Sequence, residues 1–261
     1  MRIRFWGTRG SIPVALTAAD VRDKLAQALV QASGRTFATY EEAHAFASSE
    51  LDFSITHTFG GHSPCVEIEL PGANEYFVCD MGSGARPFGV HVMAKQARAP
   101  ATVNVFMSHV HWDHIMGFPF FGPAYAPGTK IRIHGVHDIL EHAGKVAIYS
   151  TDSEHKLENR AEAEGFAKFF RNADVVIFDA MYALAEAISV KADWGHSSNI
   201  VGVELCQMAR AKHLVLFHHE PANNDATLEG LLKEARRFEE LTRTDHALKV
   251  SAAYDGLEID L

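Results

Sequence analysis

Short runs of apolar or alternating residues recur along the chain, and each has the length of a β-strand. Residues 2–6 alternate charged and apolar side chains, which is typical of a strand with one buried face. A Gly-rich turn follows at 7–13. The same reasoning predicts further strands at 65–70, 76–79, 103–107, 130–134, 145–149, 175–178 and 213–217.

Helical patterns lie between several of these strands, including the stretches 199–210 and 227–241. Strands and helices mixed in this way, with polar residues at strand ends, indicate an α/β protein of the α+β type in which helices cover the sheets. No internal repeat, low-complexity segment or clear linker interrupts the pattern. We therefore expect one domain over residues 1–261.

The segment from about 17 to 50 has helical patterns in place of strand patterns and is interpreted as a helical insertion between two β-rich stretches. Thr17 and Thr39 are predicted N-caps, because each has an acidic residue three positions later. Apolar residues at helical spacing follow Thr17, and Gly34 is the predicted stop. The sequence leaves three alternative roles for the insertion: simple packing, a lid or a dimer contact.

Composition places the chain among ordinary globular proteins. It has 261 residues, of which 47% are hydrophobic and 22% charged, so it can bury a sizeable core. No apolar run has the length of a membrane span, and residues 1–7 lack the apolar core of a signal peptide. We expect a cytoplasmic protein that does not enter the membrane, with Cys65, Cys79 and Cys206 as buried reduced thiols.

The formal net charge of −9 disfavours a large nucleic acid as partner, because phosphate contacts need Lys and Arg. A bound pair of metal ions would add local positive charge, so a small anionic substrate stays possible. The chain also has 16 histidines, and histidine is the commonest metal ligand.

One histidine cluster carries the strongest chemical signal, the segment HVHWDH at 109–114. If the preceding strand ends just before it, His109 and His111 leave the same face and converge on one point. The chain then turns, which places Asp113 and His114 in a first helical turn aimed at the same region. Two imidazoles on one ion, with a carboxylate and a third imidazole on a neighbour, suit Zn²⁺ or another borderline divalent ion. The alternative is a surface histidine cluster in a loop.

Further polar residues follow other predicted strands, where a sheet-based site collects its ligands. Asp152 could bridge two ions, and His218 could complete the second. Asp179 and His196 could form a proton-donating pair, because a carboxylate fixes the tautomer of an imidazole and raises its pKa. Capping and loop hydrogen bonds are the alternative roles for these four residues.

Taken in order, these segments resemble the metallo-β-lactamase superfamily, and within it the branch of ribonuclease Z and related phosphodiesterases. FWGTRGSIP at 5–13 is similar to the family's first strand and glycine turn, and GGHSPC at 60–65 to the entry of its second strand. FVCDMGSG at 77–84 looks like the Asp-x-Gly element behind the site, and 109–114 like the signature motif. The resemblance covers nearly the whole chain.

The resemblance implies a four-layer αββα sandwich with two metal ions at one edge of the two sheets. It implies a ligand set that shares Asp152 as the bridge: His109, His111 and Asp152 on the first ion, and Asp113, His114, Asp152 and His218 on the second. Asp80 would be a support residue, and Asp113 would also orient the nucleophile. His196, backed by Asp179, would supply the proton to the leaving group.

The chain departs from the family pattern before Asp152. The family has another strand group there, which carries a further histidine ligand to the first ion. Here EHAGKVAI at 141–148 runs from a predicted helix almost directly into the strand that precedes Asp152. Relative to the family pattern a segment is therefore absent near 143–146, through either a real deletion or an incomplete sequence, and His142, within the predicted helix, is a poor substitute ligand.

These features predict a metal-dependent hydrolase that acts on a small phosphodiester. Its cofactor would be two divalent ions, expected to be zinc, with manganese or iron as alternatives. One rival is the same fold acting on a lactone, thioester or other carbonyl ester. Another is a metal-binding or sensory module without catalysis. A homodimer that uses the helical insertion is a further hypothesis.

Overall fold

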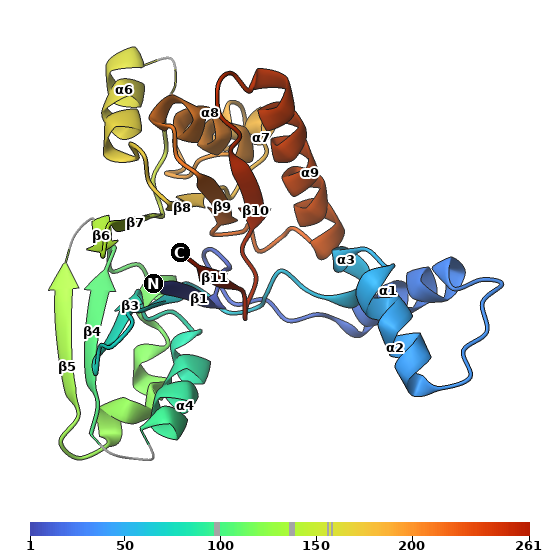
Figure 1. Cartoon of the computed structure of the whole chain (residues 1–261), viewed down its shortest axis with the longest axis horizontal. Coiled ribbons are helices and arrows are strands. Elements are labelled where there is room, and N and C mark those ends of the chain that lie inside the picture. The colour runs from blue at the N-terminus through green and yellow to red at the C-terminus, as the bar shows by residue number, and fades with distance from the viewer. Residues whose placement is uncertain (97–99, 136–138, 156, 158) are drawn as a thin grey trace.

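Two β-sheets face each other at the centre of the molecule, and helices cover their outer faces (Figure 1). The computed structural model describes residues 1–96, 100–135, 139–155, 157 and 159–261. The first sheet contains, in spatial order, β11 (Glu258–Asp260), β1 (Arg2–Gly7), β2 (Cys65–Glu69), β3 (Tyr76–Cys79), β4 (Thr102–Met107) and β5 (Lys130–Gly135). The second contains β10 (Lys249–Ala252), β9 (His213–Phe217), β8 (Val175–Asp179), β7 (Lys145–Ser150) and β6 (Ile139–His142).

The inner strands are apolar on both faces because each face meets a different layer. In β8, Val175 and Ile177 pack between the two sheets, whereas Val176 and Phe178 pack against the outer helices. The helices over the second sheet are α6 (Arg160–Phe169), α8 (Asn199–Ala209) and α9 (Asp225–Thr242). A short helix, α7 (Leu184–Ala187), precedes α8.

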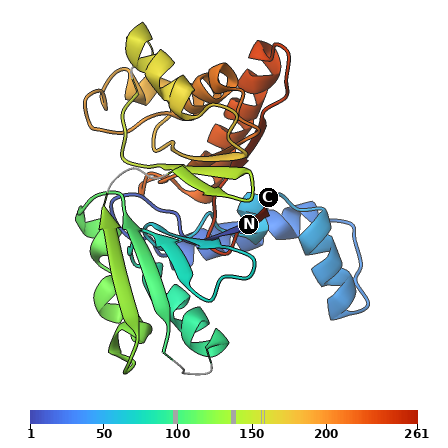
Figure 2. The ribbon, with the colours of Figure 1, turned by 60° about the vertical axis from the view of Figure 1, so that its left-hand side comes forward.

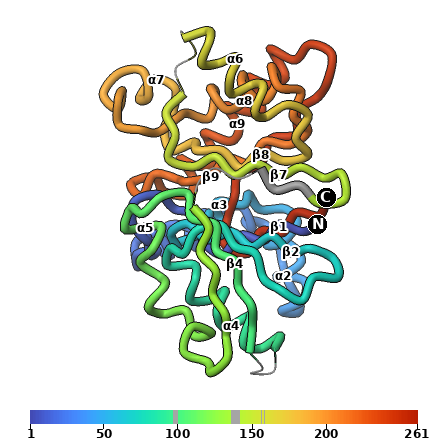
Figure 3. Tube along the Cα trace, turned by 90° about the vertical axis from the view of Figure 1, so that its left-hand side faces the viewer, coloured from blue at the N-terminus to red at the C-terminus, as the bar shows by residue number. Residues whose placement is uncertain are grey.

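The outer face of the first sheet is covered by a smaller helical layer. It consists of α4 (Ala85–Lys95) and two 3₁₀ turns, η1 (Phe118–Phe120) and η2 (Gly122–Tyr125). Phe88 of α4 stacks on Phe121 with 5.5 Å between the ring centroids. Figure 3 shows the two halves one above the other, each with its sheet facing inward. The four-layer αββα arrangement implied by the sequence is therefore confirmed.

Parallel strands place their carboxyl ends at a common edge of each sheet. β3 pairs in parallel with β4, and β7, β8 and β9 are parallel neighbours. Residues that follow these strands therefore meet at one edge of the sandwich. All the strands predicted from the sequence are confirmed, with ends that differ by at most two residues.

The predicted helix before the β7 strand is wrong. Residues Ile139–His142 form β6, which pairs antiparallel with β7 through a two-residue turn. Both turn residues, Ala143 and Gly144, have positive φ angles of 52° and 74°. Two successive left-handed residues form the turn that best joins twisted antiparallel strands, so the chain passes directly from β6 to β7. His142 lies on β6 opposite Lys145.

The insertion between β1 and β2 is helical, as predicted, and extends from the body of the sandwich (Figures 1 and 2). It contains α1 (Ala18–Gln31), α2 (Tyr40–Ser49) and the short α3 (Phe53–Thr56). Thr17 caps α1 in a capping box with Asp20, and Thr39 caps α2. Lys24 joins this arm to the body through an ion pair of 2.7 Å with the buried Asp225.

No residue of α1 is buried, and the apolar positions that predicted this helix face solvent: Val21, Leu25 and Leu29 are 46%, 59% and 72% exposed. The dimer contact suggested for the insertion stays a prediction. Among the described residues no helix is long and apolar enough to cross a membrane. The three cysteines are buried, as expected.

Several histidines are buried in the core of the protein. His213, at the start of β9, is 6% exposed, and its ring nitrogen Nε2 lies 2.8 Å from the Ser251 hydroxyl. Burial, together with the charge of Lys249, lowers the pKa of His213 to about 4 from its ordinary 6.5. Below pH 6.5 the His213 side chain is therefore protonated in the unfolded chain, whereas in the folded protein it stays neutral down to about pH 4.

We expect the free energy of unfolding to fall as the pH decreases from 6.5 toward 4, because protons then favour the unfolded state. The contribution of His213 should be roughly 1 kcal/mol per pH unit. In His213→Gln, urea unfolding measured at pH 7.5, 6.5 and 5.5 should show a smaller slope than in the parent protein. His44→Gln, on the exposed face of α2, is the matched control. Equal slopes in the parent and His213→Gln would contradict this assignment.

Candidate metal centre

The histidine cluster at 109–114 follows β4 and folds as its spacing predicted. The rings of His109 and His111 converge, with 4.3 Å between their centroids. The chain then enters the one-turn helix α5 (Trp112–Ile115), which buries Asp113 and His114. The His111 carbonyl accepts a hydrogen bond from the His114 amide, which fixes this turn.

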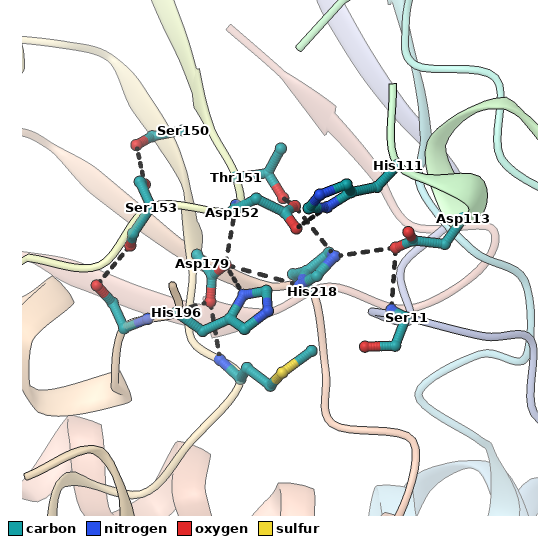
Figure 4. Close-up of polar contacts among 12 residues, drawn as sticks. Ser11, His111, Asp113, Ser150, Thr151, Asp152, Ser153, Asp179, His196 and His218 are labelled. Carbon is teal, nitrogen blue, oxygen red and sulfur yellow. Dashed lines mark hydrogen bonds and ion pairs between the residues drawn. The ribbon is translucent and has the colours of Figure 1, made fainter. Parts of the chain in front are cut away.

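Asp152 follows β7 and lies between the imidazoles. Its oxygen Oδ1 is 3.5 Å from His109 Nε2 and 4.0 Å from His111 Nδ1. Its other oxygen, Oδ2, is 3.0 Å from His114 Nε2 and 3.2 Å from His218 Nε2. One carboxylate therefore faces two separate pairs of histidines through different oxygens. Figure 4 shows one histidine of each pair, His111 and His218, beside Asp152.

Asp113 completes the buried side of the centre. Its Oδ2 lies 3.2 Å from His114 Nε2 and 3.3 Å from His218 Nε2. The Ser11 amide, in the glycine turn after β1, donates a hydrogen bond of 2.9 Å to the same oxygen. Gly10 is required in this turn, because a Cβ atom there would lie 2.7 Å from the His218 ring.

These side chains form groups that could hold metal ions. His109, His111 and Asp152 offer ligand atoms that all lie within 4.8 Å of one another, and so do Asp113, His114 and His218. A third group joins His196 to Asp152 and His218. His142 is in none of the groups found among the described residues.

The donor set fits a divalent cation. His109 Nε2 is buried and has no hydrogen-bond partner, although Asp152 faces it. Buried imidazoles that converge with carboxylates are the usual ligands of zinc and similar ions. A buried nitrogen without a partner is costly in a folded protein, and a metal ion would satisfy it.

The electrostatics of the carboxylates agree with this reading. Burial favours a neutral carboxyl, but the facing imidazoles of His218 and His114 hold the pKa of Asp152 well below its usual range. Burial acts in the same way on Asp113, where hydrogen bonds from His114 and His218 lower the pKa. Both carboxylates are therefore ionised and available to a cation.

Asp80, predicted as a support residue, follows β3 and is fully buried behind the centre. It accepts hydrogen bonds from the Ser108 amide and hydroxyl at 2.8 and 2.7 Å. It also faces His114 Nδ1 at 2.7 Å, and accepts a 2.8 Å bond from the Tyr149 hydroxyl. With Nδ1 engaged, the Nε2 atom of His114 points into the centre.

The pair formed by Asp179 and His196 lies beside the buried group. Asp179 is the last residue of β8, and its Oδ2 is 2.8 Å from His196 Nδ1. The same oxygen accepts a hydrogen bond from the Asp152 amide. Burial lowers the pKa of His196, but the hydrogen bond to Asp179 and the nearby negative charges of Asp179, Asp152 and Asp113 together raise it above its ordinary value. The His196 ring stacks on His218, with 5.1 Å between centroids.

The centre also includes residues that the sequence reasoning missed. Tyr149 lies in an apolar strand and resembles a core residue, so nothing in its neighbourhood signals a hydrogen bond to Asp80. Ser11 acts through its backbone amide, which leaves no side-chain signature. Ser108 alone had a usable signal, because it immediately precedes the histidine cluster.

Asp80→Asn tests the support role. The change removes negative charge behind His114 and replaces one acceptor oxygen with a donor. We expect metal affinity to fall about 10- to 100-fold, the usual cost of losing such a partner, as measured by calorimetric titration with Zn²⁺. Asp174→Asn removes another buried carboxylate, which pairs with Lys212 away from the centre, and is the matched control. Unchanged affinity in Asp80→Asn would rule out this role.

No protein-family profile matches the sequence, and no functionally curated protein matches it. Solved structures do resemble it. The metallo-β-lactamase fold protein YhfI from Bacillus subtilis has a TM-score of 0.61 and 14% identity, over 99% of this chain and 98% of that one. Human tRNase Z, short form, has a TM-score of 0.53 and 14% identity, over 100% and 99%. A diphosphatase of the PhnP family has a TM-score of 0.51 and 15% identity, over 100% and 97%.

At this level of identity the similarity concerns the arrangement of the chain in space. It extends over nearly the full length of all three proteins. It agrees with the two facing sheets and their outer helices. The chain therefore has the metallo-β-lactamase fold, as the motifs in its sequence implied.

Proposed function

We propose that this protein is a hydrolase that uses two divalent metal ions to cleave a small phosphodiester. The observation that carries the proposal is the position of Asp152, whose two oxygens face two different pairs of histidines. Such a carboxylate can be shared by two ions. His109 and His111 would complete the first ligand set, and Asp113, His114 and His218 the second.

A divalent ion pair, when bound, lowers the pKa of water toward neutrality and stabilises charge on ester oxygens. The residues of the chain supply the other parts of the reaction. Asp113, held by the Ser11 amide, can accept a hydrogen bond from the attacking water and orient it. His196 can give a proton to the departing oxygen, while Asp179 fixes the ring through Nδ1.

The pair of His196 and Asp179 can supply a proton to a departing alkoxide beside the metal ligands, and phosphodiesters and carboxylic esters both release an alkoxide. Phosphorus chemistry is favoured over carbonyl chemistry by the names of two similar structures, a diphosphatase and a tRNase Z, which refer to phosphoryl substrates. A small substrate is favoured over RNA because the net charge of the chain is −9.

We expect the metal-loaded protein to hydrolyse bis(p-nitrophenyl) phosphate in preference to p-nitrophenyl acetate and a β-lactam. Diphenyl phosphate has a poorer leaving group and depends more on a proton donor. His196→Ala should therefore reduce kcat for diphenyl phosphate by about 10²- to 10⁴-fold, and should affect the nitrophenyl ester less.

The exposed His44→Ala is the matched control and should leave both rates unchanged. Equal losses on both phosphodiesters, accompanied by lost metal, would assign His196 to metal binding instead. Turnover of the carbonyl ester alone would favour the rival ester or lactone activity. Bound metal without turnover of any substrate would favour a metal-binding or sensory module.

The two ligand sets differ in burial, so their affinities should differ. The first relies on His111, whose side chain is 74% exposed and must be ordered by the ion. Apart from the shared Asp152, the second is formed by residues that are all buried. Immobilising one side chain costs about 0.5–1.5 kcal/mol, and 1.4 kcal/mol is a factor of ten in affinity.

Calorimetric titration of metal-depleted protein with Zn²⁺ should thus show a tight first equivalent and a second that is weaker by roughly 2- to 12-fold. His111→Ala should remove the weak phase and keep the tight one, whereas His218→Ala should remove the tight one. Two equal sites in the parent protein would contradict the expected inequality. Loss of the tight phase in His111→Ala would reverse the order of the two sites.

A further inference from the structure

A cavity of about 770 Å³ opens beside the candidate metal centre, between β4, β7 and α6. His109 and Asp152 form part of its wall, so the cavity and the centre share two residues. A volume of this size is typical of small-molecule sites in proteins. The catalytic pair on the other side of the centre, Asp179 and His196, does not line it.

Aromatic residues form one part of the cavity wall, and small hydroxyl residues that include Ser150 and Ser153 form another. Phe106 comes from β4, Tyr149 from β7, and Phe166 and Phe169 from α6. The Tyr149 hydroxyl is occupied by Asp80, so the residue presents its ring to the space. Phe166 and Phe169 are separated by three positions and therefore lie on the same face of α6.

The position of α6 is fixed independently of any ligand. Its first turn is capped by Asn159, whose side chain accepts a hydrogen bond from the Glu162 amide. Phe166 packs edge-on against His155, with 4.0 Å between ring centroids, and that histidine stacks on the buried Phe178. The aromatic wall is thus held by the core of the second sheet.

The charge of the cavity limits what it can accept. Its described lining residues include no Lys or Arg, and the carboxylate of Glu162 stands at the wall formed by α6. A second phosphate group, as in an extended nucleic acid, would meet this carboxylate without any compensating cation. An uncharged aromatic group would instead bury its surface against the phenylalanines.

We propose that this cavity binds an uncharged aromatic ester group of the substrate while the phosphorus lies at the metal centre. The inference rests on the proposed function and narrows its substrate class to phosphodiesters with an aryl group. Exposed apolar residues beside the centre fit the same class of substrate: Val110 and Trp112, within the histidine cluster, are 76% and 68% exposed.

Binding of phosphonates tests this inference without hydrolysis, because their carbon–phosphorus bond is stable in such a site. For the zinc-loaded protein, calorimetry should show that phenylphosphonate binds about 10- to 100-fold more tightly than methylphosphonate. In Phe169→Ala and Phe166→Leu this ratio should fall severalfold toward one, with methylphosphonate affinity unchanged. Tyr40→Ala, an exposed aromatic residue on α2, is the matched control and should keep the ratio of the parent protein.

Glu162→Gln tests separately whether the Glu162 carboxylate excludes a negatively charged group from the cavity. The parent protein should bind 4-carboxyphenylphosphonate at least about 10-fold more weakly than phenylphosphonate. In the variant the difference in affinity between these two phosphonates should be smaller. Equal affinity for phenyl- and methylphosphonate in the parent protein would overturn the cavity proposal and leave the proposed hydrolase intact. A phenyl preference that survives both phenylalanine variants would also overturn it. Failure of both phosphonates to bind would overturn both proposals.

Discussion

The buried carboxylate of Asp80 is the constraint on which the candidate metal centre depends. It follows β3, accepts hydrogen bonds from Ser108 after β4, and reaches Tyr149 on β7 of the opposite sheet. It also engages His114 of the histidine cluster. One anion therefore joins both sheets and the short helix α5, and its cost of burial is met by donors from each. The separation of the two sheets and the direction of the His114 ring are fixed by the same contacts.

The centre is chemically asymmetric. On one side lie the exposed His111 and the aromatic cavity, which offer space and apolar surface. On the other lie the buried His218 and the pair of Asp179 and His196, where hydrogen bonds fix each ring. Asp152 stands between the two sides. This division matches a reaction in which one part of a substrate must be held and another must be protonated as it departs.

Much of the fold could be predicted from sequence because its signals are local. The inner strands β8 and β9 of the second sheet are almost continuous apolar runs, since both of their faces are covered, and such runs are easily recognised. The cluster at 109–114 is equally local, because four potential ligands lie within six positions. The capping threonines of the arm, Thr17 and Thr39, likewise act on residues three positions away.

What could not be predicted depends on distant partners or on unusual backbone. β6 was mistaken for a helix because its turn uses an alanine in the left-handed region, where glycine or asparagine would have given a signal. Tyr149 joins the centre through Asp80, which is 69 positions away. The aromatic cavity arises where α6 crosses the ends of β4 and β7, so its members come from three segments and share no motif.

Three residues that contribute side chains to the centre also have left-handed backbone. The φ angles are 61° at Asp80, 48° at Asp152 and 59° at His218. Each such residue costs of order 1–3 kcal/mol relative to a relaxed backbone, and glycine would adopt the same angles freely. The polypeptide here would be locally more relaxed with glycine at these positions, which would remove two candidate ligands and the carboxylate that supports them. At these three positions the chain therefore keeps the side chain that the centre needs, although glycine would give a less strained backbone.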